Sequence, residues 1–170
     1  MGKGGAVNSG GLFLGEYERA LDPQCRLSLP SEWRSAGDGG AFVMMPAANG
    51  AVILLPEAAF RRFFEAASAD SVADPALQEA FAYLGSRSRF CRCDKQGRMA
   101  LDREILTGIG ITDQLKLVGA VTHIRLCAPS GWQPSADQED LERCLAVVRQ
   151  AKADSAAICP GLPTAGSRKK

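Results

Sequence analysis

The feature that most constrains the fold is a short charged motif that occurs twice, 72 residues apart. ALDPQCRLSLP spans residues 20–30 and RCDKQGRMALD spans residues 92–102. In each, Gln follows Asp by two residues and Arg follows it by four, and an alternating apolar run comes next. The spacing indicates two copies of one β-rich unit. A second copy covers the apolar face that an isolated hairpin leaves exposed to water.

The segments around the two turns predict strands. Segments 12–21 and 25–29 flank the first turn, and we expect them to pair with each other. Segments 88–93 and 98–101 flank the second turn in the same way. Two more hairpins are predicted, from AFVMM and AVILL joined by PAANG, and from LKLVG followed by VTHIRL.

Helices are predicted from Pro56 through PEAAFRRFFEAASA, over 75–84 after Asp74, and over 136–153. Ser31 is expected to cap a single helical turn. The last helix places Leu141, Leu145 and Val148 on one stripe and begins with acidic residues, which suit the helix dipole.

The predicted fold class is therefore β-rich α+β, with flanking helices. The expected organisation is a flexible tail at 1–10, a first half at 11–84, a second half with the C-terminal helix at 85–155, and a flexible tail at 156–170.

Composition and sequence patterns argue against a membrane span, a signal peptide and a zinc site. The net charge is +1, so bulk charge favours no nucleic acid, membrane or acidic substrate. No apolar run is long enough for a membrane span, and we expect no signal peptide, because the start is polar and rich in glycine. The six cysteines form no C-x-x-C pair and accompany one histidine. We predict free thiols in the cytoplasm, no zinc site and no cofactor.

The turn itself has a specific expected geometry. Asp94 accepts a hydrogen bond from the amide two residues on, and Gly97 adopts a positive φ. Lys95 and Arg98 then project from a rigid tip. In the first copy Cys25 replaces the glycine, which costs about 1–2 kcal/mol if that position is left-handed. The plainest interpretation of each Asp–Arg pair is a surface salt bridge worth roughly 0–1 kcal/mol.

Two observations favour a function for the turns: they are duplicated, and the second lies in a basic stretch. That stretch carries a net charge of +4 in a chain whose total is +1. Its cations are Arg87, Arg89, Arg92, Lys95, Arg98 and Arg103. Arg87 and Arg89 share strand parity, so we expect both on the side of the turn tip. Most charge runs are only solvated faces.

These motifs resemble the MraZ family of bacterial transcriptional regulators. The resemblance rests on LGEYERALD, the D-x-x-x-R turn at 22–26, RLSLPSEWR, DKQGR, LKLVG and Trp132, and it covers roughly residues 12–150. It implies two AbrB-like swapped-hairpin halves that form one pseudo-twofold β-barrel. It also implies a ring-shaped homo-oligomer in the cytoplasm, associated with the nucleoid. Such a protein binds repeated promoter boxes in double-stranded DNA upstream of a cell-division and cell-wall gene cluster that includes its own gene.

The resemblance assigns roles to the turn residues. Arg26 and Arg98 take the positions of the arginines that contact DNA, and Asp22 and Asp94 shape the loops together with Gly97. Arginine is the common bidentate reader of guanine in the major groove. Phosphate contacts are expected from the other cations of the basic stretch, namely Lys95, Arg87, Arg89 and Arg92.

Three residues depart from the family pattern. Gln24 and Cys25 stand where Lys-Gly is usual, which weakens the expectation for the Arg26 loop. Asp102 stands where proline is usual and would place an acid near the second tip, where it repels phosphate.

Two other classes of function compete with this prediction. An enzyme is disfavoured, because His123 lies alone in an apolar strand without a neighbouring nucleophile or a glycine-rich phosphate loop. The other is a protein-binding module of antitoxin type, since AbrB-like halves also occur in antitoxins. Antitoxins usually carry one half and a disordered tail, whereas this chain has two halves and only a short C-terminal end.

Overall fold

The computed structural model describes residues 11–34, 40–68, 73–134 and 137–158. The predicted tail at 1–10, and residues 159–170 of the predicted tail at 156–170, lie outside the described residues. The prediction is wrong for 156–158, which belong to a helix. The chain divides into two units, Met1–Trp132 and Gln133–Lys170. Each unit is described by itself below.

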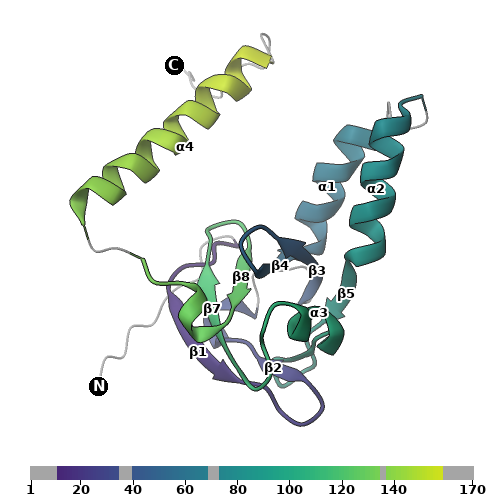
Figure 1. Cartoon of the computed structure of the whole chain (residues 1–170), viewed down its shortest axis with the longest axis vertical. Coiled ribbons are helices and arrows are strands. Elements are labelled where there is room, and N and C mark those ends of the chain that lie inside the picture. The colour runs from purple at the N-terminus through teal and green to yellow at the C-terminus, as the bar shows by residue number, and fades with distance from the viewer. Residues whose placement is uncertain (1–10, 35–39, 69–72, 135–136, 159–170) are drawn as a thin grey trace, which may run out of the picture. The chain divides into compact units, whose positions relative to one another are not determined.

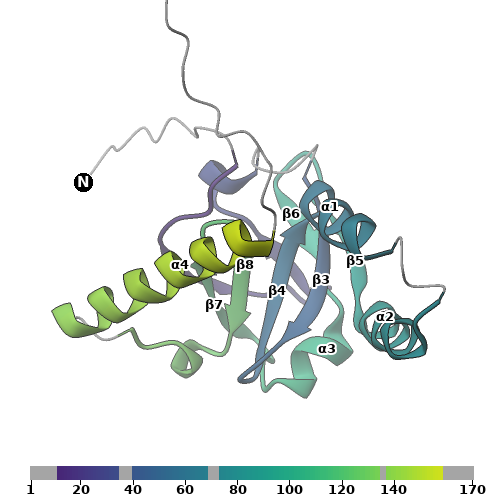
Figure 2. The ribbon, with the colours of Figure 1, turned by 90° about the horizontal axis from the view of Figure 1, so that it is seen from above.

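The first unit is built on antiparallel strands, which form one six-stranded sheet and one two-stranded ribbon (Figure 1). The strands are β1 (Glu16–Ala20), β2 (Arg26–Ser28), β3 (Ala41–Ala47), β4 (Ala51–Pro56), β5 (Arg89–Arg92), β6 (Arg98–Ala100), β7 (Gln114–Gly119) and β8 (Ile124–Cys127). The sheet order is β1-β7-β8-β4-β3-β5, and β2 pairs with β6 in the ribbon. Figure 2 shows the run from β7 through β8, β4 and β3 to β5.

The offset of 72 residues recurs in these strands. Adding 72 to the range of each of the first four strands gives the range of one of the last four to within a residue or two at either end. If each strand of the first copy is exchanged with its counterpart in the second copy, the sheet order becomes the same order read from the other edge. A pseudo-twofold axis therefore passes between β4 and β8, where Ile53 pairs with Arg125, and through the ribbon, where Leu27 pairs with Met99.

The strands around each turn do not pair with each other as predicted. β1 pairs with β7, with Glu16 opposite Val118, and β2 pairs with β6. Likewise β5 pairs with β3. The first strand of each copy thus joins the sheet of the other copy. Turn signals identify strand ends, but this exchange depends on contacts about 100 residues apart in sequence, such as Glu16 with Val118.

The two other predicted hairpins are confirmed. β3 and β4 are antiparallel around the three-residue loop Ala48, Asn49 and Gly50, and Asn49 and Gly50 have positive φ. β7 and β8 form the corresponding pair in the second copy.

The coarse fold class, a mixed α and β protein with an antiparallel sheet, is confirmed, whereas the barrel is not. Within the described residues, no pairing joins the edge strands β1 and β5. A closed barrel needs hydrogen bonds between all neighbouring strands. Here the three-residue strands β2 and β6 bond to each other, while β2 contacts β1 and β6 contacts β5. One isolated bridge, from Cys93 to Met99, forms beside the second turn.

The core fixes the orientation of the ribbon. Leu27 and Met99, at its centre, are fully buried in the same cluster as Phe13, Trp33 and Phe42. The Phe13 ring meets the Trp33 ring edge to face at 5.8 Å. Because strand side chains alternate, the residues on either side of Leu27 and Met99 must face outward.

Helices occur near the predicted positions. They are η1 (Ser31–Trp33), α1 (Glu57–Ser68), α2 (Pro75–Arg87), α3 (Arg103–Gly108), η2 (Pro129–Gly131) and α4 (Gln138–Ile158). Asp74 caps α2 by accepting the Ala76 and Leu77 amides. η1 is present but lacks the predicted Ser31 cap, because Pro30 occupies the cap position. Sequence patterns missed α3, and α4 runs past the predicted end at 153 to Ile158.

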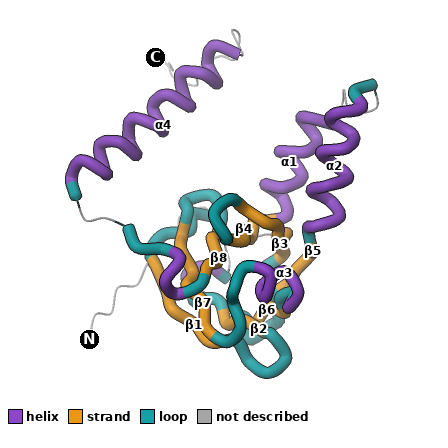
Figure 3. The backbone as a smooth tube through the Cα atoms, viewed as in Figure 1, coloured by secondary structure: helices purple, strands orange, loops and turns teal. Residues whose placement is uncertain are grey.

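Helices α1 and α2 lie side by side, and the Phe64 and Phe81 rings are 5.4 Å apart. Figure 3 shows the strands gathered in one part of this unit, with α1 and α2 extending from it. The ribbon and its two turns belong to the strand-rich part.

Candidate nucleic-acid interface

Each D-x-x-x-R turn is closed by the same set of hydrogen bonds. Asp22 Oδ1 accepts the Gln24 and Arg26 amides, both at 2.9 Å. Asp94 Oδ1 accepts the equivalent amides, Gln96 at 2.8 Å and Arg98 at 2.9 Å. The predicted aspartate-fixed turn is confirmed at Asp94, and the first copy, for which a different loop shape was expected, has the same bonds. All these partners lie within five consecutive residues, so the motif specifies the turn locally.

The position before each arginine is left-handed in both turns. Gly97 has φ 78° and Cys25 has φ 57°. Cys25 therefore has the left-handed conformation that was considered for this position. Its backbone conformation costs about 1–2 kcal/mol relative to glycine. The Cys25 side chain is buried in the core. The Cys25 carbonyl accepts the Leu101 amide at 3.0 Å, as the Gly97 carbonyl accepts the Leu29 amide at 2.9 Å. The substitution thus leaves the shape of the first loop unchanged.

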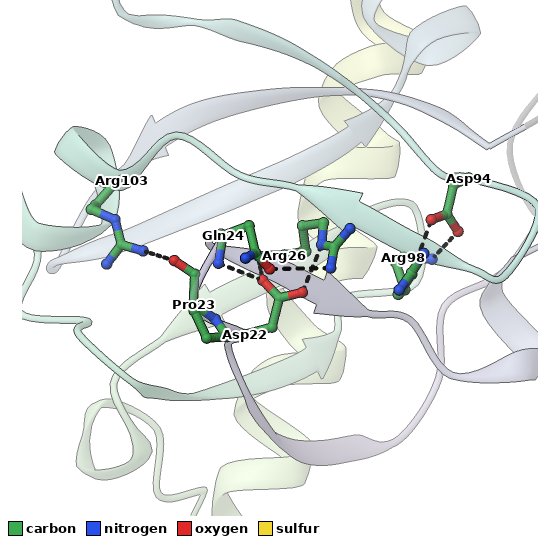
Figure 4. A network of polar contacts seen from close by, with 7 residues as sticks. All are labelled: Asp22, Pro23, Gln24, Arg26, Asp94, Arg98 and Arg103. Atoms are coloured by element: carbon green, nitrogen blue, oxygen red, sulfur yellow. Dashed lines mark hydrogen bonds and ion pairs between the residues drawn. The ribbon is translucent and has the colours of Figure 1, made fainter.

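The aspartates also hold the arginine side chains. Arg26 Nε donates to Asp22 Oδ2 at 2.6 Å, and Arg98 Nε donates to Asp94 Oδ2 at 3.0 Å (Figure 4). Because the bond uses Nε, the terminal Nη groups remain at the outer edge of each guanidinium. Arg26 Nη2 also donates to Gln24 Oε1 at 3.2 Å. The two side chains are 34% and 37% exposed, so each guanidinium is both held and accessible.

The two arginines lie on one face of the ribbon. Arg26 is opposite Ala100, and Ser28 is opposite Arg98. Arg26 and Arg98 are therefore diagonal neighbours, with about 7–8 Å between them in a standard antiparallel pair. Their position on the outward face follows from the burial of Leu27 and Met99 on the inward face. A two-stranded β-ribbon of this kind fits the major groove of B-DNA.

Hydrogen bonding favours the charged form of both aspartates. The Arg98 amide does most to lower the pKa of Asp94, partial desolvation opposes it, and the Gln96 amide and Arg98 guanidinium add to the lowering. For Asp22, desolvation raises the pKa, but the bonds from Arg26 and Gln24 outweigh it and the net pKa lies below the ordinary value. A lowered carboxyl pKa means that this stabilisation is present above about pH 3.8 and is lost as the pH falls further.

Two arginines without a predicted role at the turns, Arg34 and Arg103, contact them across the pseudo-twofold axis. Arg34, which follows η1, donates from Nε to the Leu29 carbonyl at 2.9 Å and passes over Gly97. A Cβ at Gly97 would collide with its guanidinium. Arg103, from α3, donates to the Pro23 carbonyl at 3.1 Å. Each turn is thus braced by an arginine of the other copy, and since 34 and 103 break the 72-residue offset, no sequence signal reveals them.

The other predicted contact residues lie at different places. Lys95 is exposed at the tip of the second turn. Arg92 ends β5, with its guanidinium 5.5 Å from the centre of the Phe90 ring. Arg87 is the last residue of α2 and stacks on Tyr83 at 4.7 Å. The expectation that Arg87 and Arg89 share strand parity is therefore wrong, because the helix runs up to Arg87 and only Arg89 is in the strand.

Asp102 has a structural role that differs from the one expected. Its Oδ1 accepts the Ile105 amide at 3.1 Å and caps α3, while its Oδ2 accepts Arg89 Nε at 3.0 Å. Arg89 also donates to the Ser86 and Ser88 carbonyls. The charge of Asp102 is thus partly neutralised by Arg89. Because Arg89 already makes these bonds, it has fewer N–H donors free for a phosphate than Lys95 has.

The described residues offer little support for other kinds of site. No group of three or more of their His, Cys, Asp or Glu side chains is placed to hold a metal ion. Among the same residues, no helix is long and apolar enough to cross a membrane. His123 is partly buried in a hairpin turn, where its Nδ1 is 3.2 Å from Thr122 Oγ1.

Comparison with known proteins finds similarity to transcriptional regulators. No protein-family model matches the chain. The transcriptional regulator MraZ of Thermomicrobium roseum is 25% identical over 126 residues, which cover 74% of this chain and 88% of that protein. The MraZ of Heliobacterium modesticaldum is 27% identical over 123 residues, covering 71% and 84%. That of Mycobacterium bovis is 27% identical over 122 residues, covering 72% and 85%. The predicted resemblance is confirmed, since the chain is similar over about three quarters of its length to proteins named transcriptional regulator MraZ.

Proposed function

We propose that this protein is a sequence-specific DNA-binding transcriptional regulator, and that it represses the division and cell-wall gene cluster containing its own gene. One observation carries the proposal. Arg26 and Arg98 lie diagonally on the outward face of a two-stranded ribbon, each held through Nε by an aspartate of its own turn. The relatives are named transcriptional regulators, which supports the same role.

The geometry suits base reading better than phosphate binding alone. A guanidinium whose Nε is already bonded loses little side-chain freedom when it meets a base edge, so more of the contact energy appears as affinity. Its terminal groups present paired donors, which match O6 and N7 of guanine. In this proposal Arg26 and Arg98 read bases, while Lys95, Arg87, Arg92 and, more weakly, Arg89 contact phosphates.

The proposal includes two tandem AbrB-like halves and a ring-shaped homo-oligomer that engages repeated promoter boxes. A single chain with a net charge of +1 has a weak overall attraction for DNA. Several copies that present the same basic face gain effective concentration when one box is already bound. The protein then acts in the cytoplasm, at the nucleoid. Native mass spectrometry gives the subunit number, and a monomer at micromolar concentration contradicts the ring.

The test is a binding titration with the DNA upstream of the protein's own gene, against a scrambled duplex, at two salt concentrations. We expect selective, salt-sensitive binding by the natural chain. Arg98→Ala should lose about 1–3 kcal/mol of specific binding, because a bidentate base contact is removed. Arg61→Ala is the matched control, since Arg61 bonds Glu57 within α1 and lies away from the ribbon.

Two results would overturn the proposal. Equal affinity for the upstream and the scrambled duplex at both salt concentrations would show that binding is not sequence-specific. A neutral Arg98→Ala, with selectivity intact, removes the ribbon arginine as a reader. Stable one-to-one binding of a small protein partner without DNA binding would instead favour a module of antitoxin type.

A further inference from the structure

Helix α4 (Gln138–Ile158) carries an apolar stripe that is exposed to solvent. Leu141, Leu145 and Val148 follow one another at spacings of four and three residues and are 60%, 45% and 67% exposed. Cys144, beside the stripe, is also exposed. Helices in proteins gain most of their stability by packing an apolar face against another element. This spacing is that of a helix–helix seam.

The charges along α4 indicate which kind of partner fits the stripe. Glu139 and Glu142 lie in its first part, and Arg149 and Lys152 lie further along. Arg143 is already paired with Asp140 of the same helix at 2.7 Å. A helix that is acidic at its start and basic further on is complementary to a second copy of itself that runs in the opposite direction. Antiparallel helix dipoles add to this preference.

The residue numbers match this arrangement. A twofold axis between Leu145 and Ala146 sets Glu142 opposite Arg149, and at 3.6 residues per turn both residues lie on the same flank of the stripe. The pair of Glu142 and Arg149 occurs twice, once on either side of the axis. In a parallel arrangement Glu142 would face Glu142, and Arg149 would face Arg149. Ion pairs at the rim of a contact select orientation more than they add affinity.

We infer that α4 binds α4 of a second copy of this chain in antiparallel orientation, with Leu141, Leu145 and Val148 at the seam. Such a contact is self-complementary and closes at two copies. If other surfaces build a ring, the α4 contact joins chains in pairs within or between rings. This inference rests on α4 alone and does not depend on DNA binding. The experiments that test it therefore measure only the contact between two α4 helices.

The first experiment uses full-length chains in which Cys144 and Cys159 are changed to Ser. One preparation also carries Glu142→Cys and the other Arg149→Cys. A short bismaleimide should join the two preparations when they are mixed, and each alone should give a far lower yield. The reason is that two copies of position 142 lie on opposite sides of the axis, about 10 Å apart along the helix at 1.5 Å per residue.

Cross-linking of Glu142→Cys with itself, at the yield of the mixture, would show a parallel contact and overturn the proposal. The absence of any α4 cross-link, at a concentration where the chains associate, would also overturn it. That result would mean that the stripe packs within its own chain or meets another protein.

The second experiment reverses charges and measures self-association by sedimentation. Glu142→Arg and Arg149→Glu should each weaken it on the order of tenfold at low salt, because each change sets two like-charged pairs across the seam. The mixture of the two variants, and the double variant, should regain the original association. Arg143→Glu makes the same charge change away from the stripe and should leave association nearly unaltered. Weakening without recovery in the mixture would refute the antiparallel pairing.

Discussion

A substitution at Gly97 tests whether Arg34, from the first copy, stabilises the turn of the second copy. Gly97→Ala places a Cβ at φ 78° and directs it at the Arg34 guanidinium, which then loses its bond to the Leu29 carbonyl. Gly50→Ala is the matched control, because Gly50 has φ 63° and a Cβ added there would meet nothing within 4 Å. The two changes therefore share the backbone strain and differ in the collision with Arg34.

The magnitudes follow from these contacts. Left-handed strain costs about 1–2 kcal/mol, and reduced freedom of the unfolded chain returns about 0.4–1 kcal/mol, so Gly50→Ala should cost about 1 kcal/mol. Losing the Arg34 hydrogen bond adds about 0.5–1.5 kcal/mol, so Gly97→Ala should cost about 2 kcal/mol. In an Arg34→Ala background, Gly97→Ala should fall back to the cost of Gly50→Ala.

The assay is urea unfolding followed by tryptophan fluorescence, since Trp33 is 2% exposed in the folded chain. All variants need the same protein concentration, because self-association shifts apparent stability. Equal costs for Gly97→Ala and Gly50→Ala would refute the brace. So would a Gly97→Ala cost that stays the same when Arg34 is absent.

Two further predictions concern binding and pH. Lys95→Ala should weaken binding to every duplex alike and reduce the salt slope by about one unit in polarisation titrations, as a phosphate contact does; a loss confined to one sequence would contradict that role. Burial, and then the charge of Arg125, lower the pKa of His123 below its ordinary 6.5. The unfolded chain therefore takes up this proton first, and stability falls as the pH drops through about 6.5 towards the lower pKa of the folded chain. His123→Gln should remove that part of the fall in Tm, and an unchanged pH profile would show that this histidine does not contribute.

Sequence alone determined the features that depend on neighbouring residues. The two turns were predictable because every bond of Asp22 and Asp94 described above reaches no further than four residues along the chain. The start of α2 was predictable for the same reason, since Asp74 bonds amides two and three residues away. The duplicated motif also located the strands of both copies, because the two copies follow one pattern.

Only the tertiary structure decided the partners of the strands around the two turns and the residues that surround each turn. Periodicity shows that β1 and β2 are strands, but their partners lie in the other copy, and many pairings satisfy the same alternating pattern. Arg34 reaches Gly97, and Arg103 reaches Pro23, only because the copies are interleaved. The ribbon that carries Arg26 and Arg98 on one face exists for the same reason: its two strands are 72 residues apart, and folding alone brings them together.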